Sequence, residues 1–209
     1  MRYNKVTIVT LRRIRWHFSE DDMARKVMFT KQEILNAALD ITRESGFDSV
    51  TARAIGNKLG TSYRPICSFF ENMSDVQNAV VEEANEIYQN YLKEDMSSGK
   101  YPPYKASGMA YIRFAREEKE LFKLLFMRER TDEEKAKVAS EFEMISELIV
   151  KQVNGITKKQ ASLFYLEMWT YVHGIATMIA TNYYDWDEEL CSRTLTDMYL
   201  GLKQKYENK

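Results

Sequence analysis

The fold is decided by the stretch Ser49-Val-Thr-Ala-Arg-Ala-Ile-Gly-Asn-Lys-Leu-Gly-Thr-Ser-Tyr-Arg-Pro-Ile-Cys-Ser-Phe-Phe70, which predicts two short helices joined by a tight turn. Thr51 is placed to cap the first helix through its hydroxyl, and Ala54, Ile55 and Leu59 give that helix one apolar face. Gly60 lacks a Cβ and can take the left-handed conformation that a short turn between crossed helices requires. The pattern indicates a helix-turn-helix.

The second of these helices is expected to begin at Ser62, with Pro65 in its first turn. There the missing N–H and the fixed φ of proline cost little, whereas deeper in a helix proline costs about 3 kcal/mol. Tyr63 and Arg64 would then be exposed near the helix N-terminus, where they can contact a DNA phosphate or a base edge. An ordinary helical hairpin in an all-α core has the same spacing, so the flanking sequence must separate the two interpretations.

Length and composition describe a soluble globular protein of one or two domains, with 209 residues, 44% hydrophobic and 29% charged. Cys67 and Cys191 lie far apart in sequence, which favours packing roles in a reducing compartment, the cytoplasm by default. The only histidines are His17 and His173, and no Glu-x-x-His or Cys-x-x-Cys motif occurs, which disfavours a metal site. Neither an enzyme nor a bound cofactor is expected.

Charge is distributed unevenly along the chain. The net charge is −1 overall, but residues 1–75 carry +3 and residues 76–209 carry −4. This is the direction expected if the N-terminal part meets DNA phosphates, and it supports the motif without establishing the function.

Residues 1–22 form an extension of different character, in which a short β-favouring run is followed by Arg12, Arg13, Arg15 and Trp16. The apolar run is too short for a signal peptide or a membrane span. The extension is either a basic arm that reaches for DNA, or disordered or non-native sequence upstream of a start at Met23. We favour the second interpretation, because Met23 leads straight into the first helix signal.

The remaining sequence predicts an all-α fold of about nine helices, since no strand pattern occurs. Capping boxes open three helices, at Thr30 with Glu33, Thr131 with Glu134 and Thr157 with Gln160. We expect a helix-turn-helix DNA-binding domain at residues 23–75 and a helical ligand-binding and dimerisation domain at residues 76–209. The other predicted starts are Asn72 or Ser74 for a long fourth helix, residues 107–117 and 119–129 for two short helices, and Asp185 for the last helix.

The penultimate helix is apolar all round, and such a helix is buried all round. One side is expected in the domain core and another in a homodimer interface of four helices, where Gly174 and Ala180 allow close approach. The residues expected in that interface are Leu163, Ile175, Ala176, Ile179, Leu195, Met198 and Leu202.

With these pieces assembled, the chain resembles the tetracycline-repressor (TetR) family of bacterial transcription regulators. The similarity lies in the runs Ile34-Leu-Asn-Ala-Ala-Leu-Asp-Ile, Ser45-Gly-Phe-Asp-Ser-Val-Thr-Ala-Arg-Ala-Ile and Leu59-Gly-Thr-Ser, with Ile66 and Phe69-Phe70. Met168-Trp-Thr-Tyr-Val-His-Gly is also similar to the Trp-x-x-x-His-Gly element of one branch of the family. The resemblance implies a dimeric repressor that binds a palindromic operator in double-stranded DNA and is released by a small-molecule effector.

Three positions depart from the family's DNA-binding pattern. Cys67 stands where a phosphate-contacting Tyr is usual, Phe69 where His is frequent, and Met73 where Lys is usual. Each lost phosphate contact removes about one unit of salt slope. The departures leave a second interpretation open. The chain could be a ligand- or protein-binding helical module with a decayed reading head, that is, a DNA-binding part that has lost its ability to bind DNA. The candidate DNA-binding positions are Thr51, Arg53, Ser62, Tyr63, Arg64, Cys67, Phe69 and Met73.

Aromatic and methionine side chains of the C-terminal part are suited to line an apolar cavity for a hydrophobic or aromatic effector. The same residues at helical spacing also fit a packed core, and both interpretations stay open. The candidate pocket residues are Tyr111, Phe114, Phe126, Met144, Tyr165, Trp169 and His173.

Overall fold

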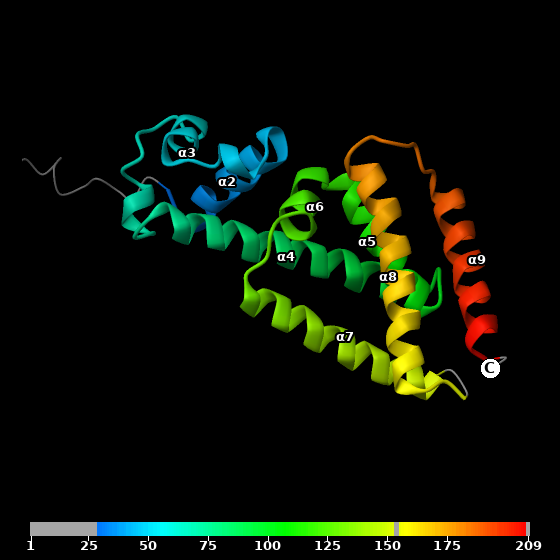
Figure 1. Ribbon diagram of the computed structural model, residues 1–209. Coiled ribbons are helices and arrows are strands. Elements are labelled where there is room, and N and C mark those ends of the chain that lie inside the picture. Colours follow the sequence, from blue (N-terminus) through cyan, green and yellow to red (C-terminus); the bar gives the residue numbers. More distant parts are fainter. Residues whose placement is uncertain (1–28, 153–154, 208–209) are drawn as a thin grey trace, which may run out of the picture.

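The computed structural model describes residues 29–152 and 155–207, and within these residues it contains helices and turns but no strand (Figure 1). The predicted all-α class is confirmed. The prediction for residues 1–22 lies outside the described part. The α-helices are α2 (Lys31–Ser45), α3 (Ala52–Lys58), α4 (Met73–Ser97), α5 (Pro103–Glu117), α6 (Lys119–Phe126), α7 (Asp132–Gln152), α8 (Lys158–Ala180) and α9 (Glu188–Glu207).

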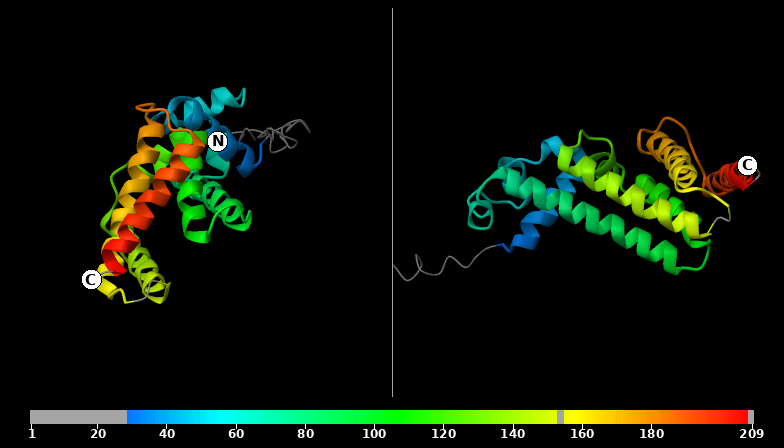
Figure 2. Two further views of the ribbon diagram at one scale, coloured as in Figure 1. Left: turned by 90° about the vertical axis from the view of Figure 1, so that its right-hand side faces the viewer. Right: turned by 60° about the horizontal axis from the view of Figure 1, so that its bottom comes forward.

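The long helix α4 connects two parts of the molecule. Helices α2 and α3 lie at its N-terminal end and form the part that we call the head, residues 29–72 (Figure 1). Its C-terminal half packs on α5, which in turn packs on α8. Helix α9 lies beside α8, and α7 packs along another side of α8 (Figures 1 and 2). We call α5 to α9 the body.

The predicted capping boxes explain where several helices begin. At the start of α2 the N–H of Glu33 donates to Thr30 Oγ1 over 3.1 Å, and Glu33 Oε2 accepts from the N–H of Thr30 over 2.6 Å. The equivalent reciprocal pair opens α8 at Thr157. The last helix differs from the prediction by two residues, because Asp187 rather than Asp185 accepts from a backbone N–H of the first turn, that of Leu190, over 2.7 Å. Capping residues therefore place the starts of α2 and α8 correctly, whereas α5, expected at residue 107, begins at Pro103, and α6, expected to end at residue 129, ends at Phe126.

A single hydrophobic cluster runs from the head into the body. It includes Ile34 and Ile55 of the head, Val80 of α4, Phe122 of α6 and Leu195 of α9, all buried. A smaller cluster around Phe164 joins the far ends of α7, α8 and α9. The head is therefore packed onto the body through shared apolar side chains. No helix in the described ranges combines the length and the apolar character that crossing a membrane requires.

Candidate reading segment, aromatic cluster and outer face of α8

The first helix of the helix-turn-helix forms as predicted. The N–H of Ala54 donates to Thr51 Oγ1 over 3.2 Å at the start of α3, and Ile55 is completely buried. Gly60 follows with a φ of +67°, the left-handed conformation that its lack of a Cβ allows. The turn prediction is confirmed.

The second helix does not form as predicted. Residues 61–65 form bends and turns, and between α3 and α4 the only helical element of the described chain is a three-residue 3-10 turn, Ile66–Ser68. We call residues 61–68 the reading segment. The predicted α-helix from Ser62 is therefore wrong, and its absence leaves eight α-helices in the described residues. Pro65 has helical dihedrals (φ −57°, ψ −32°), and the N–H groups of Ile66 and Ser68 donate to the carbonyls of Tyr63 and Pro65 over 3.1 and 3.2 Å, so tight turns stand where the α-helix was expected.

The candidate DNA-binding residues divide into exposed and packed positions. Tyr63 is 58% exposed, and Thr51, Arg53, Ser62, Arg64 and Cys67 are also exposed. Phe69 and Met73 are instead half-buried against the hydrophobic core. Two of the three departures from the family pattern therefore serve packing, and Cys67 is the one that remains at the surface.

Gly56 of α3 allows the turn that follows to lie directly against the helix, and the sequence analysis did not identify it. A Cβ at this position would lie 3.0 Å from the carbonyl oxygen of Thr61 and 3.1 Å from the carbonyl carbon of Ser62. These are backbone atoms that cannot rotate away. The reading segment thus rests directly on the α3 backbone, and only glycine permits that approach.

Replacing Gly56 by alanine is expected to destabilise the protein by about 1–3 kcal/mol, the usual cost of overpacking, although alanine is the better helix former. The measurement is urea unfolding followed by circular dichroism. Gly201→Ala in α9 is the matched control, because its Cβ would meet nothing within 4 Å. A Gly56→Ala protein as stable as the Gly201→Ala protein would show that the reading segment does not rest on α3.

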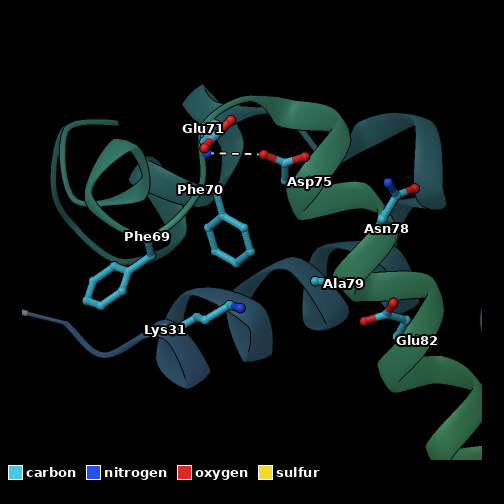
Figure 3. Close-up of a pocket in the computed structure, with 8 residues that line it drawn as sticks. All are labelled: Lys31, Phe69, Phe70, Glu71, Asp75, Asn78, Ala79 and Glu82. Carbon is cyan, nitrogen blue, oxygen red and sulfur yellow. Dashed lines mark hydrogen bonds between the residues drawn. The ribbon is translucent and has the colours of Figure 1, made fainter.

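A hollow of about 400 Å³ lies between α2 and the start of α4 (Figure 3). Three carboxylates line it, those of Glu71, Asp75 and Glu82, together with Lys31, whose ammonium lies 5.1 Å from the centre of the Phe70 ring. Asp75 Oδ2 accepts from the N–H of Glu71 over 3.2 Å, which Figure 3 shows as a dashed line. In the part of the chain that the structure describes, no three His, Cys, Asp or Glu residues are grouped to hold a metal ion.

These carboxylates affect what the start of α4 can bind. A helix N-terminus with free N–H groups attracts phosphate, but here Asn72 accepts from the N–H of Asp75 over 3.1 Å and Glu71 is exposed beside it. Negative side chains at this place repel a DNA phosphate. The start of α4 is therefore unsuited to the phosphate contact that Lys at position 73 would supply.

Several candidate pocket residues form a packed aromatic cluster between α4, α5 and α6. The ring centres of Tyr111 and Phe126 are 4.8 Å apart, and those of Tyr111 and Phe122 are 5.3 Å apart. Tyr88 of α4 was missed by the sequence analysis, although it lies 5.2 Å from Phe126 and 5.3 Å from Phe114. Phe114 and Phe122 are completely buried. This part of the predicted pocket is hydrophobic core.

The polar group of the cluster is His173 on α8. Its Nδ1 lies 2.9 Å from the hydroxyl of Tyr111, and the Trp169 ring stacks on the imidazole at 4.8 Å, nearly parallel. Burial lowers the pKa of His173, and the nearby Arg130 lowers it further, so the imidazole is neutral at pH 7. Burial raises the pKa of the Tyr111 phenol far above its ordinary value, so that phenol keeps its proton. We assign the hydroxyl as the donor to Nδ1.

A second aromatic group continues from this histidine toward α7. Phe142, also missed in the sequence, lies 4.6 Å from Tyr165 and 5.8 Å from Trp169, measured between ring centres. Tyr165, Trp169 and His173 keep partial exposure, yet burial raises the pKa of Tyr165 to about 12. Met144 does not belong to the group, because it is 60% exposed on α7.

The outer face of α8 carries an apolar hollow of about 530 Å³ next to α9. Leu166 and Thr170 are exposed there, and Gly174 lies between them and Met178 along the helix. A Cβ on Gly174 would meet nothing within 4 Å, so this part of α8 is open. The other lining residues are Glu167, Tyr171, Ile175, Trp186 and Met198.

This face corrects the list of expected interface residues. Ile175, Ala176, Ile179, Leu195 and Leu202 are all at most 7% exposed, because they pack inside the subunit's own hydrophobic clusters. Of the predicted set, Met198 and the buried Ile175 line the hollow, and Leu163 is 44% exposed. The sequence showed that α8 is apolar on every side but not which side meets the core. The residues of α8 that are open at this face are instead Leu166, Thr170, Tyr171, Gly174 and Met178.

Comparison with known proteins gives this architecture a context. Residues 104–199 match the family model described as the tetracyclin repressor-like, C-terminal domain. No curated protein matches the chain by sequence. Similar solved structures include a TetR-like transcriptional regulator from Rhodococcus sp. RHA1, with a TM-score of 0.63 and 16% identity over 85% of this chain and 96% of that chain.

Two further structures agree with the first. Another transcriptional regulator from the same organism has a TM-score of 0.55 and 14% identity, over 86% of this chain and 98% of that one. The multidrug binding protein EbrR, in complex with imidazole, has a TM-score of 0.52 and 17% identity, over 80% and 93% of the two chains. The chain therefore has the fold of TetR-like transcriptional regulators, with a TetR-like C-terminal domain.

Proposed function

We propose that the protein is a dimeric, ligand-responsive transcriptional repressor that acts in the cytoplasm and binds a palindromic DNA operator. A small molecule that enters the body releases it from DNA. The observation that carries the proposal is that one fold contains both α3 with the exposed reading segment and a TetR-like C-terminal domain, joined by α4. No catalytic activity and no cofactor form part of this function.

The effector is proposed to bind beside the aromatic residues of α8. Trp169 and His173 are the first and last side chains of the Trp-x-x-x-His sequence, and their rings stack nearly parallel with centres 4.8 Å apart. Tyr165 and Phe142 extend the same aromatic surface toward α7. Rings that present flat apolar faces, with a neutral imidazole and phenol hydroxyls between them, favour a hydrophobic or aromatic ligand.

The DNA-binding part of the proposal rests on Arg64, which is exposed in the reading segment. Arg64→Ala is expected to weaken specific binding by about 1–3 kcal/mol and to relax the preference at one position of each half-site, as for an arginine that reads a base. Selection from random duplex DNA, followed by fluorescence anisotropy at several salt concentrations, measures both effects. Half-sites should lie about 34 Å apart, or a multiple of that distance.

Two variants serve as controls for this experiment. Tyr63→Phe should change sequence preference less than Arg64→Ala, because a phenol hydroxyl on phosphate positions the protein without reading a base. Arg193→Ala removes an exposed arginine from α9 and should leave DNA binding unchanged. If selection enriches no sequence at all for the unaltered protein, the repressor proposal fails.

A second candidate function is favoured by the shape of the reading segment. A 3-10 turn replaces the recognition helix, and carboxylates occupy the start of α4, as expected of a binding module whose reading head has decayed. Cys67→Tyr tests it, because Cys67 is the exposed departure from the family pattern. If the unaltered protein prefers no DNA and Cys67→Tyr acquires binding with a steeper salt dependence, the decayed-head function is the correct one.

A further inference from the structure

The contact between the head and the body is mostly apolar and therefore non-directional. Helix α2 faces α4 and α6 with buried residues such as Ile34, Ala38 and Ile41. Apolar burial stabilises a contact in proportion to its area, and packed side chains restrict the angle between two helices only to within about 15–20°. A directional interaction narrows that range.

Arg43 and Glu118 supply such an interaction. Arg43 lies in the last turn of α2, and its Nε donates to Glu118 Oε2 over 2.8 Å while its Nη2 donates to Oε1 over 2.7 Å. The Glu118 side chain is only 15% exposed and that of Arg43 is 37% exposed, so water screens the pair less than a surface pair. Two parallel hydrogen bonds between a planar guanidinium and a carboxylate fix orientation as well as distance.

Glu118 occupies the break between α5 and α6. Its backbone has a φ of −122° and a ψ of 53°, its N–H donates to the carbonyl of Phe114, and its carbonyl accepts from the N–H of Phe122. The next residue, Lys119, donates from Nζ to Asn182 Oδ1, just beyond the C-terminus of α8. Two adjacent residues thus connect the head on one side and the end of α8 on the other.

We infer that the Arg43–Glu118 pair is a latch that fixes the angle of the head on the body and transmits displacements of the α8 end to the reading segment. Arg43 and Glu118 are positioning residues, because their effect on the reading segment is indirect. Only the last step, from head angle to DNA affinity, rests on the proposed function. The latch itself is a property of one folded chain.

The latch is tested by the distance between two spin labels in the full chain, at Asn57→Cys on α3 of the head and Glu189→Cys on α9 of the body, both exposed. Cys67→Ser removes the exposed native thiol, and Cys191 is buried. Labelled protein is diluted with unlabelled protein, so that pulsed dipolar spectroscopy reports distances within one chain. Arg43→Glu and Glu118→Arg should each shift or broaden the distribution by about 1–2 Å or more, the scale of helix displacements at interfaces.

The double variant Arg43→Glu/Glu118→Arg should restore the original distribution, because it re-forms the pair with reversed charges. Arg43→Gln is measured as a milder variant in case a reversed charge unfolds the head. The matched control is the pair of Lys58 and Glu44, which are 2.6 Å apart within the head; Lys58→Glu should leave the distribution unchanged.

An unchanged distribution in the folded single variants overturns the latch, and so does equal broadening in Lys58→Glu. DNA affinity is then compared by anisotropy, where a loss of about fivefold or more in Glu118→Arg is expected from typical coupling between sites. If the unaltered protein binds no DNA, the proposed function fails while the distance measurements still decide the latch.

Discussion

Leu195→Glu is expected to unfold the subunit, whereas Thr170→Glu is expected to separate the dimer and leave each subunit folded. Leu195 of α9 is 3% exposed and packs against Gly108 of α5. A Cβ added to Gly108 would lie only 3.0 Å from Leu195 Cδ2, so the contact between the two helices has no space for a carboxylate. A buried charge without a partner is among the substitutions that cost more than about 4 kcal/mol. Thr170 is exposed in the apolar hollow of α8, where a charge is solvated in the monomer but desolvated in a dimer.

Two measurements separate these outcomes, thermal unfolding by circular dichroism and molar mass by light scattering. Asn90→Glu adds the same charge at an exposed position of α4 and should change neither quantity. A dimer that survives Thr170→Glu would exclude the outer face of α8 as the interface. A folded, stable Leu195→Glu protein would contradict the burial of α9 against α5.

Phe114→Ala is expected to lower the free energy of unfolding by about 3–5 kcal/mol, the usual cost of deleting a buried phenylalanine ring. Phe114 is completely buried, and its ring centre lies 5.3 Å from that of Tyr88 and 5.4 Å from that of Tyr91. Truncation removes both contacts and leaves a cavity between α4 and α5. Urea unfolding gives the change in free energy.

Phe142→Ala is the comparison, because Phe142 is half-buried at the edge of the second aromatic group. It should cost less stability than Phe114→Ala, since its ring keeps accessible surface in the folded protein. If Phe114→Ala costs less than about 1 kcal/mol, Phe114 lines a cavity and not a packed core, which would revive its predicted role in effector binding.

Local signals in the sequence predicted the helix ends well, because a cap depends on residues three positions apart. Thr30 with Glu33 and Thr157 with Gln160 form the expected hydrogen bonds, and Gly60 takes the expected positive φ. The segment after Gly60 did not follow its local signals. Pro65 takes helical dihedrals, as expected for a first turn, but the hydrogen bonds around it form tight turns and not the expected α-helix.

Contacts between distant residues could not be derived from periodicity. The apolar pattern of α8 is the same whether Ile175 faces a partner subunit or, as the structure shows, the core. The bond between Tyr111 and His173 joins residues 62 positions apart, and the Arg43–Glu118 pair joins residues 75 positions apart. Such pairs depend on how helices are placed in three dimensions.

Exchange of heads between proteins of this fold is restricted by the hydrophobic cluster that runs from Ile34 through Val80 to Phe122. A chimera divided after residue 75 would join a foreign α2 to the native α6, two surfaces that were not selected for one another. Shape mismatch in a packed interior typically costs about 1–3 kcal/mol, and a mismatched partner for Glu118 would also leave a partly buried carboxylate alone. A functional chimera should therefore carry α2 and the α5–α6 junction from the same parent.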